Sequence, residues 1–206
     1  MSDYLIPVFD LGGVFIDWSP LNLYRNVFDS EEEAVWFVEN VYSGLWNLEF
    51  DAGKHYADGI AELCAKFPAY TNQIKAYDDR WLETIAGVFD GTIAIHEELI
   101  AQDLPTFAIT NYSKEKFQLT LEKYEFLQKF DGILVSGQEK LVKPDYRIYH
   151  RFLERYSLDA SSCVFIDDSY PNVVAADHIG MKAVHFENPK QLREDLIELG
   201  LPLEAK

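Results

Sequence analysis

The sequence predicts an α/β protein in which a parallel sheet is covered by helices on both faces and a helical insert follows the first strand. Two observations lead to this prediction. Five apolar segments are each too short for a buried helix, and helical patterns separate the last four of them. Between the first two segments the pattern is helical only. The strands are expected at 4–11, 104–110, 132–137, 163–168 and 182–186.

The helices between the later strands are predicted from apolar residues three or four positions apart and from the signals at their ends. Ser113 is a typical N-cap for the helix after the second strand, the next helix follows Pro144, and Gly180 closes the last. This strand and helix alternation favours a parallel sheet. In such sheets the active groups gather outside the carboxyl ends of the strands.

The helical insert is expected to span residues 15–90, with 1–14 and 91–206 forming the core. Ser30 and Glu33 form a capping box, and each following pattern has one apolar face. The segment AGVFDG at 86–91 is the expected return hinge. Most of the tryptophans are predicted to be core residues, with one or two facing a substrate; all four lie in the insert: Trp18, Trp36, Trp46 and Trp81.

The composition argues against several classes of protein. A chain of 206 residues with 48% hydrophobic residues can fill one core. The net charge of -17 disfavours nucleic-acid binding, which needs a basic face, but still allows a small phosphorylated substrate. Without a basic leader or an apolar run of about 20 residues, neither export nor membrane insertion is predicted, and a cytoplasmic protein is expected. Cys64 and Cys163 lack metal-ligand spacing, so we expect buried thiols.

Six polar residues lie at the carboxyl ends of predicted strands or beside a proline near them. In chain order they are Asp10, Thr110, Asn111, Lys143, Asp167 and Asp168. Each alone is explained by a cap, a turn or a solvated surface. Gathered at one sheet edge, they provide a carboxylate nucleophile, two acids for a hard cation, a hydroxyl and an amide for phosphate oxygens, and a lysine that balances charge. The set predicts phosphoryl transfer.

Four segments occur in the order of the motifs of the haloacid dehalogenase-like hydrolases, and the chain resembles that family over almost its whole length. The segments are FDLGGV, ITN, VKPDYRIYHRFL and FIDDSYPNVVAADHIGM. The resemblance implies a Rossmann-like core with strand order 3-2-1-4-5 and a helical cap inserted after the first strand. It further implies that Asp10 is the nucleophile, that Thr110 supplies the hydroxyl that binds phosphate, and that Lys143 steadies the nucleophile and the intermediate.

Magnesium is the cofactor that this resemblance implies. Its expected ligands are Asp10, the carbonyl of Gly12, Asp168 and Asp167. We expect Asp168 to be the inner ligand, with action through water as the alternative role of Asp167. The physical reason is that an anionic nucleophile must approach a dianionic ester, and a divalent cation between them removes most of the repulsion.

Gly12 stands where phosphatases of the family usually carry the acid that protonates the leaving alcohol. Asp17 begins the insert and does not match that position by motif. Three explanations are open: a leaving group that needs little protonic help, a different chemistry, or a fold that has lost catalysis. A branch that resembles sugar-phosphate phosphatases also begins Asp-Leu-Gly, which favours the first explanation.

The sequence therefore predicts a magnesium-dependent hydrolase that removes phosphate from a small phosphorylated metabolite, such as a sugar phosphate, through an aspartyl-phosphate on Asp10. The alternatives are a non-catalytic or weakly active phosphate-binding protein and a metal-independent 2-haloacid dehalogenase. The second alternative is disfavoured because adjacent carboxylates without a cation repel each other. No oligomeric state is predicted. Candidate substrate contacts in the insert, none preferred, are Tyr42, Trp46, Asn47, Glu49 and His55.

Overall fold

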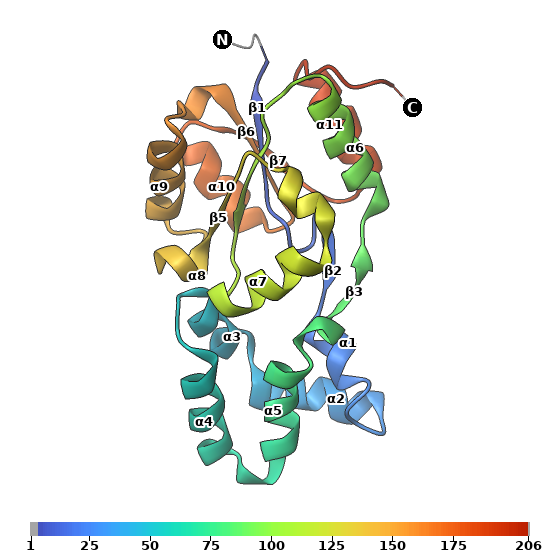
Figure 1. Cartoon of the computed structure of the whole chain (residues 1–206), viewed down its shortest axis with the longest axis vertical. Coiled ribbons are helices and arrows are strands. Elements are labelled where there is room, and N and C mark those ends of the chain that lie inside the picture. Colours follow the sequence, from blue (N-terminus) through green and yellow to red (C-terminus); the bar gives the residue numbers. More distant parts are fainter. Residues whose placement is uncertain (1–3, 206) are drawn as a thin grey trace.

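The computed structural model describes residues 4–205 and contains a five-stranded parallel sheet in the order β5-β4-β1-β6-β7 (Figure 1). This order confirms the expected 3-2-1-4-5 arrangement. Phe9 pairs with Ala108 on one side and with Ile166 on the other, so the chain after β1 leaves the sheet at its centre. The strands are β1 (Ile6–Phe9), β4 (Phe107–Thr110), β5 (Gly132–Val135), β6 (Cys163–Asp167) and β7 (Lys182–His185).

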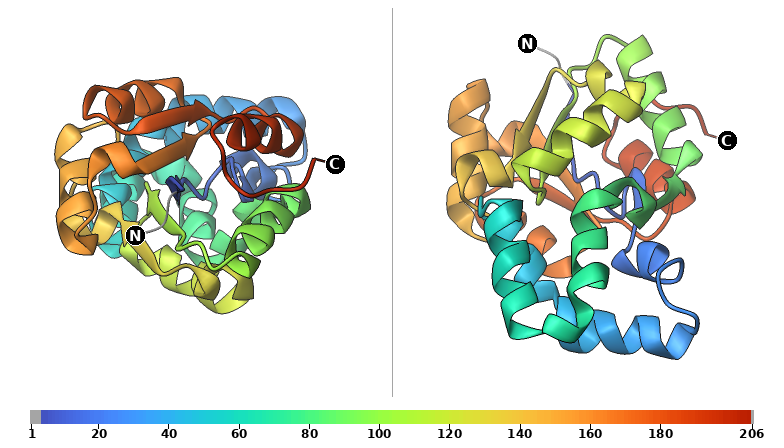
Figure 2. Two further views of the ribbon diagram at one scale, coloured as in Figure 1. Left: turned by 90° about the horizontal axis from the view of Figure 1, so that it is seen from above. Right: turned by 60° about the horizontal axis from the view of Figure 1, so that its bottom comes forward.

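Helices cover both faces of this sheet, as Figures 1 and 2 show. Side chains alternate along each strand, so Val8 packs into one apolar cluster and Phe9 into the other. One face carries α9 (Tyr146–Tyr156) and α10 (Tyr170–His178). The other carries α6 (Asp90–Ala101), α7 (Lys114–Lys123) and α11 (Pro189–Glu198), and the short α8 (Ser136–Glu139) follows β5.

A second body of helices lies below the sheet in Figure 1; we call residues 19–84 the helical insert. The predicted caps are confirmed, because Ser30 Oγ accepts a hydrogen bond from Glu33 N at 3.2 Å and Ser113 Oγ accepts one from Lys116 N at 3.2 Å. The helices of the insert are α1 (Pro20–Tyr24), α2 (Glu31–Phe37), α3 (Gly44–Asp51), α4 (Tyr56–Lys66) and α5 (Thr71–Asp79). Short 3₁₀ or π turns of the insert occupy Val38–Tyr42, Pro68–Tyr70 and Trp81–Thr84. Outside the insert, 3₁₀ turns occupy Glu125–Lys129 and Ala160–Ser162.

The expectation of a purely helical segment over 15–90 is wrong at both of its ends. There β2 (Ile16–Trp18) and β3 (Ile85–Val88) form an antiparallel ribbon that connects the insert to the sheet (Figure 1). Strands of three and four residues are too short to display a period of two, and they form because each finds its partner far along the chain. The division of the chain at residues 15 and 90 stays a prediction.

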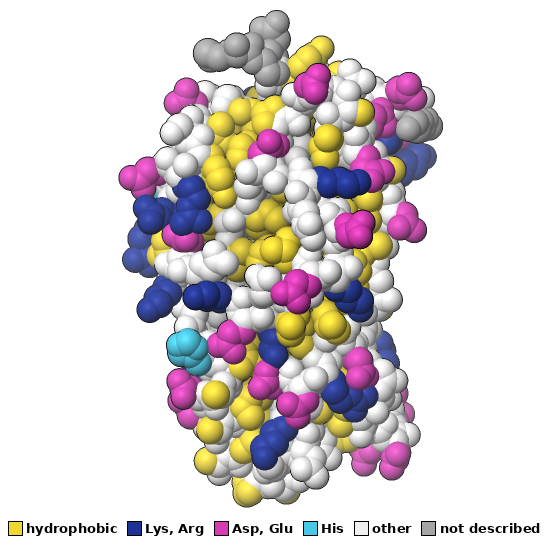
Figure 3. Space-filling model, in the orientation of Figure 1, with side chains coloured by type: hydrophobic (Ala, Val, Ile, Leu, Met, Phe, Trp, Pro, Cys, Tyr) yellow, Lys and Arg dark blue, Asp and Glu magenta, His cyan; other side chains and the backbone are white. Residues whose placement is uncertain are grey.

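The surface carries charges of both signs. Figure 3 shows basic side chains gathered over α9, and the arginines of that helix all pair with carboxylates. Their partners are Asp145 for Arg147, Glu139 and Glu154 for Arg151, and Glu139 for Arg155. Among residues 4–205 no helix has the length and apolar character needed to cross a membrane.

Lys116 of α7, a helix that packs on the sheet, contacts two helices of the insert. This residue is only 5% exposed, its Nζ pairs with the carboxylate of Asp78 on α5, and it donates to the Asp78 carbonyl oxygen at 2.8 Å. The same ammonium group lies 4.5 Å from the centre of the Tyr56 ring on α4. A buried lysine is tolerated here because its charge meets a carboxylate and an aromatic face.

We expect Lys116→Met to keep the packed stem of the side chain but to lose the ion pair, the hydrogen bond and the ring contact. Hydrogen bonds to charged groups contribute about 1.5–3 kcal/mol, so the free energy of unfolding in urea should fall by about that amount. The exposed Lys114→Met on the same helix is the matched control and should change it by less than about 0.5 kcal/mol. Equal losses for the two variants would contradict the assigned role of Lys116.

Candidate functional site

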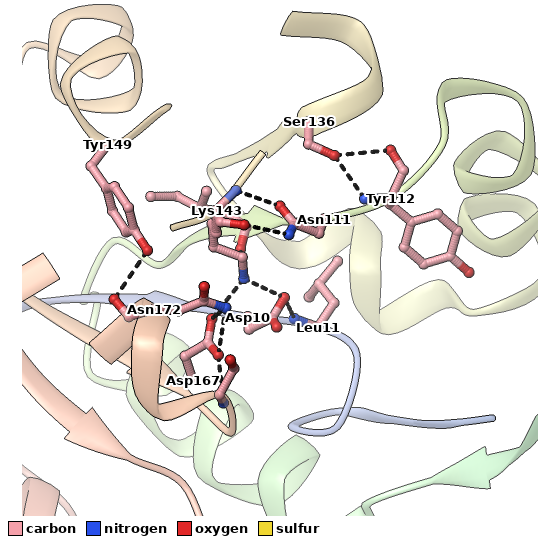
Figure 4. A network of polar contacts seen from close by, with 11 residues as sticks. Asp10, Leu11, Asn111, Tyr112, Ser136, Lys143, Tyr149, Asp167 and Asn172 are labelled. Carbon is pink, nitrogen blue, oxygen red and sulfur yellow. Dashed lines mark hydrogen bonds and ion pairs between the residues drawn. The ribbon is translucent and has the colours of Figure 1, made fainter. Parts of the chain in front are cut away.

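Asp10 stands directly after β1, at the centre of the carboxyl edge of the sheet (Figure 4). Its Oδ1 accepts hydrogen bonds from Leu11 N at 2.7 Å and pairs with Lys143 Nζ at 2.9 Å. The residue is 8% exposed, and this burial raises the pKa of the Asp10 carboxyl to about 7 against the opposing attraction of Lys143. Asp10 is therefore a carboxylate whose charge depends on nearby cations.

Lys143 supplies the buried positive charge of this edge. Its three ammonium hydrogens match three acceptors: Asp10 Oδ1 at 2.9 Å, Asp167 Oδ2 at 2.7 Å and the Ile109 carbonyl oxygen at 2.9 Å. Burial opposes the charged form, but the two carboxylates outweigh it and raise the pKa of Lys143 above its ordinary value. The lysine thus stays an ammonium ion although the residue is only 3% exposed.

The acid pair at the end of β6 has two different environments. Asp167 is buried, with Oδ1 accepting from Ser169 N at 2.8 Å and Asn172 Nδ2 at 3.1 Å, while Oδ2 faces Lys143 and the same amide. Asp168 instead lines the cavity in front of Asp10, and His185 Nε2–H donates to its carbonyl oxygen at 2.9 Å. Burial and the charge of Asp167 raise the pKa of Asp168. Only Asp168 of the pair therefore borders the open space.

Thr110 and Asn111 end β4 beside the same edge. Thr110 is buried, while Asn111 borders the cavity and uses both ends of its amide on the backbone of Lys143. Its Nδ2 donates to the Lys143 carbonyl oxygen at 3.0 Å, and its Oδ1 accepts from Lys143 N at 2.8 Å (Figure 4). Asn111 thus fixes the segment that carries the lysine. The predicted phosphate contacts of both residues stay predictions.

A cavity of about 370 Å³ lies between the sheet edge, the ribbon and the insert. Two of the four tryptophans, Trp18 and Trp81, line it with ring centroids 6.2 Å apart, whereas Trp46 is buried and Trp36 is exposed. The wall is therefore acidic near the sheet and aromatic near the ribbon. Its residues are Asp10, Gly12, Gly13, Ile16, Trp18, Asn47, Asp51, Trp81, Asn111, Tyr112 and Asp168.

Only one of the five substrate contacts proposed for the insert, Asn47, lines this cavity. Tyr42 and Trp46 are buried; the Tyr42 hydroxyl meets that of Tyr77 at 2.9 Å, and Trp46 Nε1 donates to the Gly59 carbonyl oxygen at 3.3 Å. The other two are exposed: Glu49 pairs with Lys54, and His55 with Glu115. The sequence had given no reason to prefer one of the five.

Asp51 is the cavity residue that the sequence reasoning missed. It lies one helical turn after Asn47 on α3, and the spacing i, i+4, which puts both on one face, was the available signal. Asn47 Nδ2 donates to Asp51 Oδ2 at 3.2 Å. The residue is 8% exposed, and burial raises the pKa of its carboxyl to about 7, against the opposing charge of Lys143. Asp51 therefore keeps a proton into the neutral pH range.

The paired glycines after Asp10 have different requirements. Gly13 has a φ of 73°, and a Cβ there would collide with the Asp168 carboxylate. Gly12 is outside the left-handed region, and a Cβ at this position would meet nothing within 4 Å. Gly13 is therefore needed for the turn, whereas Gly12 leaves open space in the cavity wall that it shares with Asp10.

Three carboxylates at this edge suit a hard divalent cation. Asp10, Asp167 and Asp168 each offer an oxygen atom, and these atoms lie within 4.8 Å of one another. Like charges at such distances repel, which contributes to the raised pKa values of Asp10 and Asp168. All-oxygen donors are the ligands that magnesium prefers. The cluster could thus hold this metal.

The family model described as Haloacid dehalogenase-like hydrolase matches residues 8–186, which include every residue of this edge. The chain belongs to this family. The match confirms the resemblance drawn from the four segments, and with it an enzyme of the hydrolase class.

Three known proteins resemble this haloacid dehalogenase-like hydrolase over most of its length. A sesquiterpene phosphatase from Aspergillus oryzae is 26% identical, covering 86% of this chain and 87% of that protein. A phosphorylated carbohydrates phosphatase from Thermotoga maritima is 25% identical, covering 86% and 82%. A solved HAD family enzyme from Bacteroides thetaiotaomicron, in complex with magnesium and inorganic phosphate, shares the fold with a TM-score of 0.69 at 17% identity, covering 90% and 95%.

Alanine at the two glycines should have opposite consequences. We expect Gly13→Ala to lower the free energy of unfolding by about 1–2 kcal/mol, because the left-handed backbone is strained and the Asp168 carboxylate must move. Gly12→Ala has room and an ordinary φ, so it should change stability by less than about 0.5 kcal/mol. Chemical unfolding of both variants checks this, and a more stable Gly13→Ala would contradict the turn geometry.

Proposed function

We propose that this hydrolase is a magnesium-dependent phosphatase that removes phosphate from a small phosphorylated metabolite through an aspartyl-phosphate on Asp10. One observation carries the proposal: the Asp10 carboxylate forms an ion pair with Lys143 through Oδ1 and lines a cavity together with Asp168. A fixed, partly desolvated carboxylate beside a cation site is the arrangement that a carboxylate nucleophile requires.

The two oxygens of Asp10 have distinct surroundings. Oδ1 is held by Leu11 N and Lys143 Nζ, whereas Oδ2 has no hydrogen-bond partner among residues 4–205. One carboxylate oxygen attacks phosphorus, the bond to the leaving oxygen breaks, and a water molecule later cleaves the acyl phosphate. Lys143 keeps the carboxylate oriented throughout and offsets the charge that accumulates at the edge.

A magnesium ion would be held by Asp10, the carbonyl of Gly12 and Asp168, with Asp167 acting through water. The cation would supply the charge that lets the Asp10 anion approach a phosphate dianion. The assignment of Asp168 as the inner ligand is supported by its place in the cavity wall, because both oxygens of Asp167 already accept hydrogen bonds from protein groups. Thr110 and Asn111 would contact the phosphate oxygens.

A sugar phosphate is the substrate that we propose to test first. The aromatic part of the cavity wall, with Trp18, Trp81 and Tyr112, can stack on the C–H face of a sugar ring, and Asn47 offers a polar group beside it. The same wall would also accept an apolar alcohol. A panel of sugar phosphates and isoprenoid phosphates, assayed with magnesium for released phosphate, separates these substrates.

The two alternatives predict other outcomes in the same assay. A dehalogenase would release halide from 2-haloacids in the presence of a chelator. A non-catalytic protein would bind phosphate esters without turnover. The family membership and the fold are common to all three, so the acid cluster around the cavity is the feature that favours the phosphatase.

Replacing the nucleophile gives the most direct test. We expect Asp10→Asn to lower magnesium-dependent phosphate release by at least about a thousandfold while the protein stays folded. The control, Asp17→Asn, makes the same change at an exposed residue of β2 outside the cavity wall and should retain activity. The mechanism would be overturned if Asp10→Asn kept more than a few per cent of the wild-type rate.

Asp167 and Asp168, at the end of β6, should differ when magnesium is titrated. Asp168→Asn removes a carboxylate that faces the cavity, and we expect it to weaken magnesium binding by roughly 10- to 100-fold or more. Asp167→Asn should weaken it less, but it should lower stability because Lys143 loses a buried partner. Calorimetric titration measures the magnesium affinity, and thermal unfolding measures the stability. If Asp168→Asn and Asp167→Asn bound magnesium with equal affinity, Asp168 would not be the inner ligand.

A further inference from the structure

The cavity needs a proton donor that the sheet edge does not supply. Gly12 has no side chain and so provides no acid, and the space where its Cβ would lie is empty. Asp17 is exposed in β2, while its neighbours Ile16 and Trp18 line the cavity, because successive side chains of a strand point to opposite faces. The acids of the cavity wall are therefore those of Asp10, Asp168 and Asp51, and the first two already have proposed roles.

We propose that Asp51 of α3 protonates the leaving oxygen of the phosphate ester and afterwards takes a proton from the attacking water. This role rests on the phosphatase function proposed above. It assigns to the insert the acid that the family usually places on the sheet edge at the position of Gly12.

The position of Asp51 fits this role. It is the last residue of α3, the helix of the insert that packs against α8 beside the sheet (Figure 1). Its side chain borders the same cavity of about 370 Å³ as Asp10 and Asp168. A substrate whose phosphorus faces Asp10 thus has its ester oxygen and organic group directed toward the remaining wall, to which Asp51 belongs.

The carboxyl of Asp51 is held in place by a chain of hydrogen bonds within the insert. Tyr77 OH donates to Asn47 Oδ1 at 2.6 Å, which directs the Asn47 amide nitrogen to Asp51 Oδ2 at 3.2 Å. Tyr42 OH meets Tyr77 OH at 2.9 Å behind them. Among the described residues no salt bridge involves Asp51, so no ammonium or guanidinium group holds its charge permanently.

A proton is available on Asp51 at neutral pH. Burial raises the pKa of this carboxyl to about 7, and Lys143 is the charged group that opposes the shift. The other titratable groups that interact with it are phenols whose own pKa values are raised, so they stay neutral; they are Tyr42, Tyr56, Tyr77 and Tyr112. On the neighbouring α8, Glu139 is held by Arg151 and Arg155. A pKa near the working pH suits an acid that must also act as a base.

The two steps balance with Asp51 as the proton carrier. In the first, an Asp10 oxygen forms a bond to phosphorus, the bond between phosphorus and the leaving oxygen breaks, and that oxygen takes the Asp51 proton and departs as an alcohol. In the second, a water oxygen attacks phosphorus, its proton passes to the Asp51 carboxylate, and the bond to Asp10 breaks. Both carboxyl groups end in their starting states.

The test compares leaving groups of graded acidity. Wild type, Asp51→Asn and the control Glu49→Gln are assayed with magnesium on 4-nitrophenyl, phenyl and alkyl phosphates, and kcat is measured separately from KM. Glu49 is an exposed acid on the same helix, so its substitution removes a carboxylate without touching the cavity. We expect Asp51→Asn to lose roughly 10²- to 10⁴-fold in kcat/KM on alkyl phosphates but less than about tenfold on 4-nitrophenyl phosphate, whose leaving group departs without a proton. The ratio kcat/KM is compared because it reports formation of the aspartyl-phosphate and not its later hydrolysis, which is common to all esters. Glu49→Gln should match wild type.

Each other outcome has a defined meaning. Losses of Asp51→Asn in kcat/KM that are equal on all esters, including a change that lies only in KM, would overturn the acid role and leave the phosphatase intact, since Asp51 would then only contact the substrate. Normal activity of Asp51→Asn on alkyl phosphates would also overturn it. Wild type that releases no phosphate from any ester would reject the proposed function, and this role with it.

A second measurement checks the proton on Asp51 without turnover. When the pKa of a carboxyl is higher in the folded chain than in the unfolded chain, the folded protein loses stability as pH rises between those two pKa values. The melting temperature of Asp51→Asn relative to wild type should therefore rise from about pH 4 to about pH 7 and level off above. A constant difference across this range would show that Asp51 is ionised in the folded protein, which contradicts the proposal.

Discussion

The ion pair cluster around Lys143 is the interaction on which the rest of the site depends. A buried ammonium ion is costly by itself, and it persists because two carboxylates and a carbonyl oxygen take its three hydrogens. Each acceptor comes from the end of a different strand: Asp10 after β1, Ile109 in β4 and Asp167 in β6. The lysine thereby converts the meeting point of three parallel strands into one rigid polar unit.

Further contacts brace this unit from behind. Asn111 binds the backbone of Lys143 at both of its polar groups, and Asn172 holds both oxygens of Asp167. Tyr149 OH in turn donates to the Asn172 carbonyl oxygen at 3.0 Å, so α9 and α10 are linked to the site (Figure 4). The packing of helices on one face of the sheet therefore sets the orientation of the acids at its edge.

The sequence was sufficient to predict the parallel sheet and the polar residues that meet at its carboxyl edge, because parallel strands bring their carboxyl ends together wherever they lie in the chain. The strand order was predicted from the family resemblance. It was not sufficient to predict how Asp167 and Asp168 divide their environments. That division depends on Lys143 and Asn172, which reach the pair through tertiary packing. Asp51 was missed for a related reason: the i, i+4 spacing puts it on one helix face with Asn47, but only tertiary packing places that face in the same cavity wall as Asp10 and Asp168.

The open space at Gly12 also has an evolutionary consequence. Codons for glycine and aspartate can differ by a single nucleotide, and a Cβ added at Gly12 would meet no atom within 4 Å on a backbone outside the left-handed region. An acid at that position can thus be reached by one mutation, and neither the backbone angle nor the space around the Cβ requires glycine there. A chain whose insert already carries an acid at Asp51 would gain a further carboxylate there, and with it more negative charge in the cavity that we propose binds a phosphate dianion.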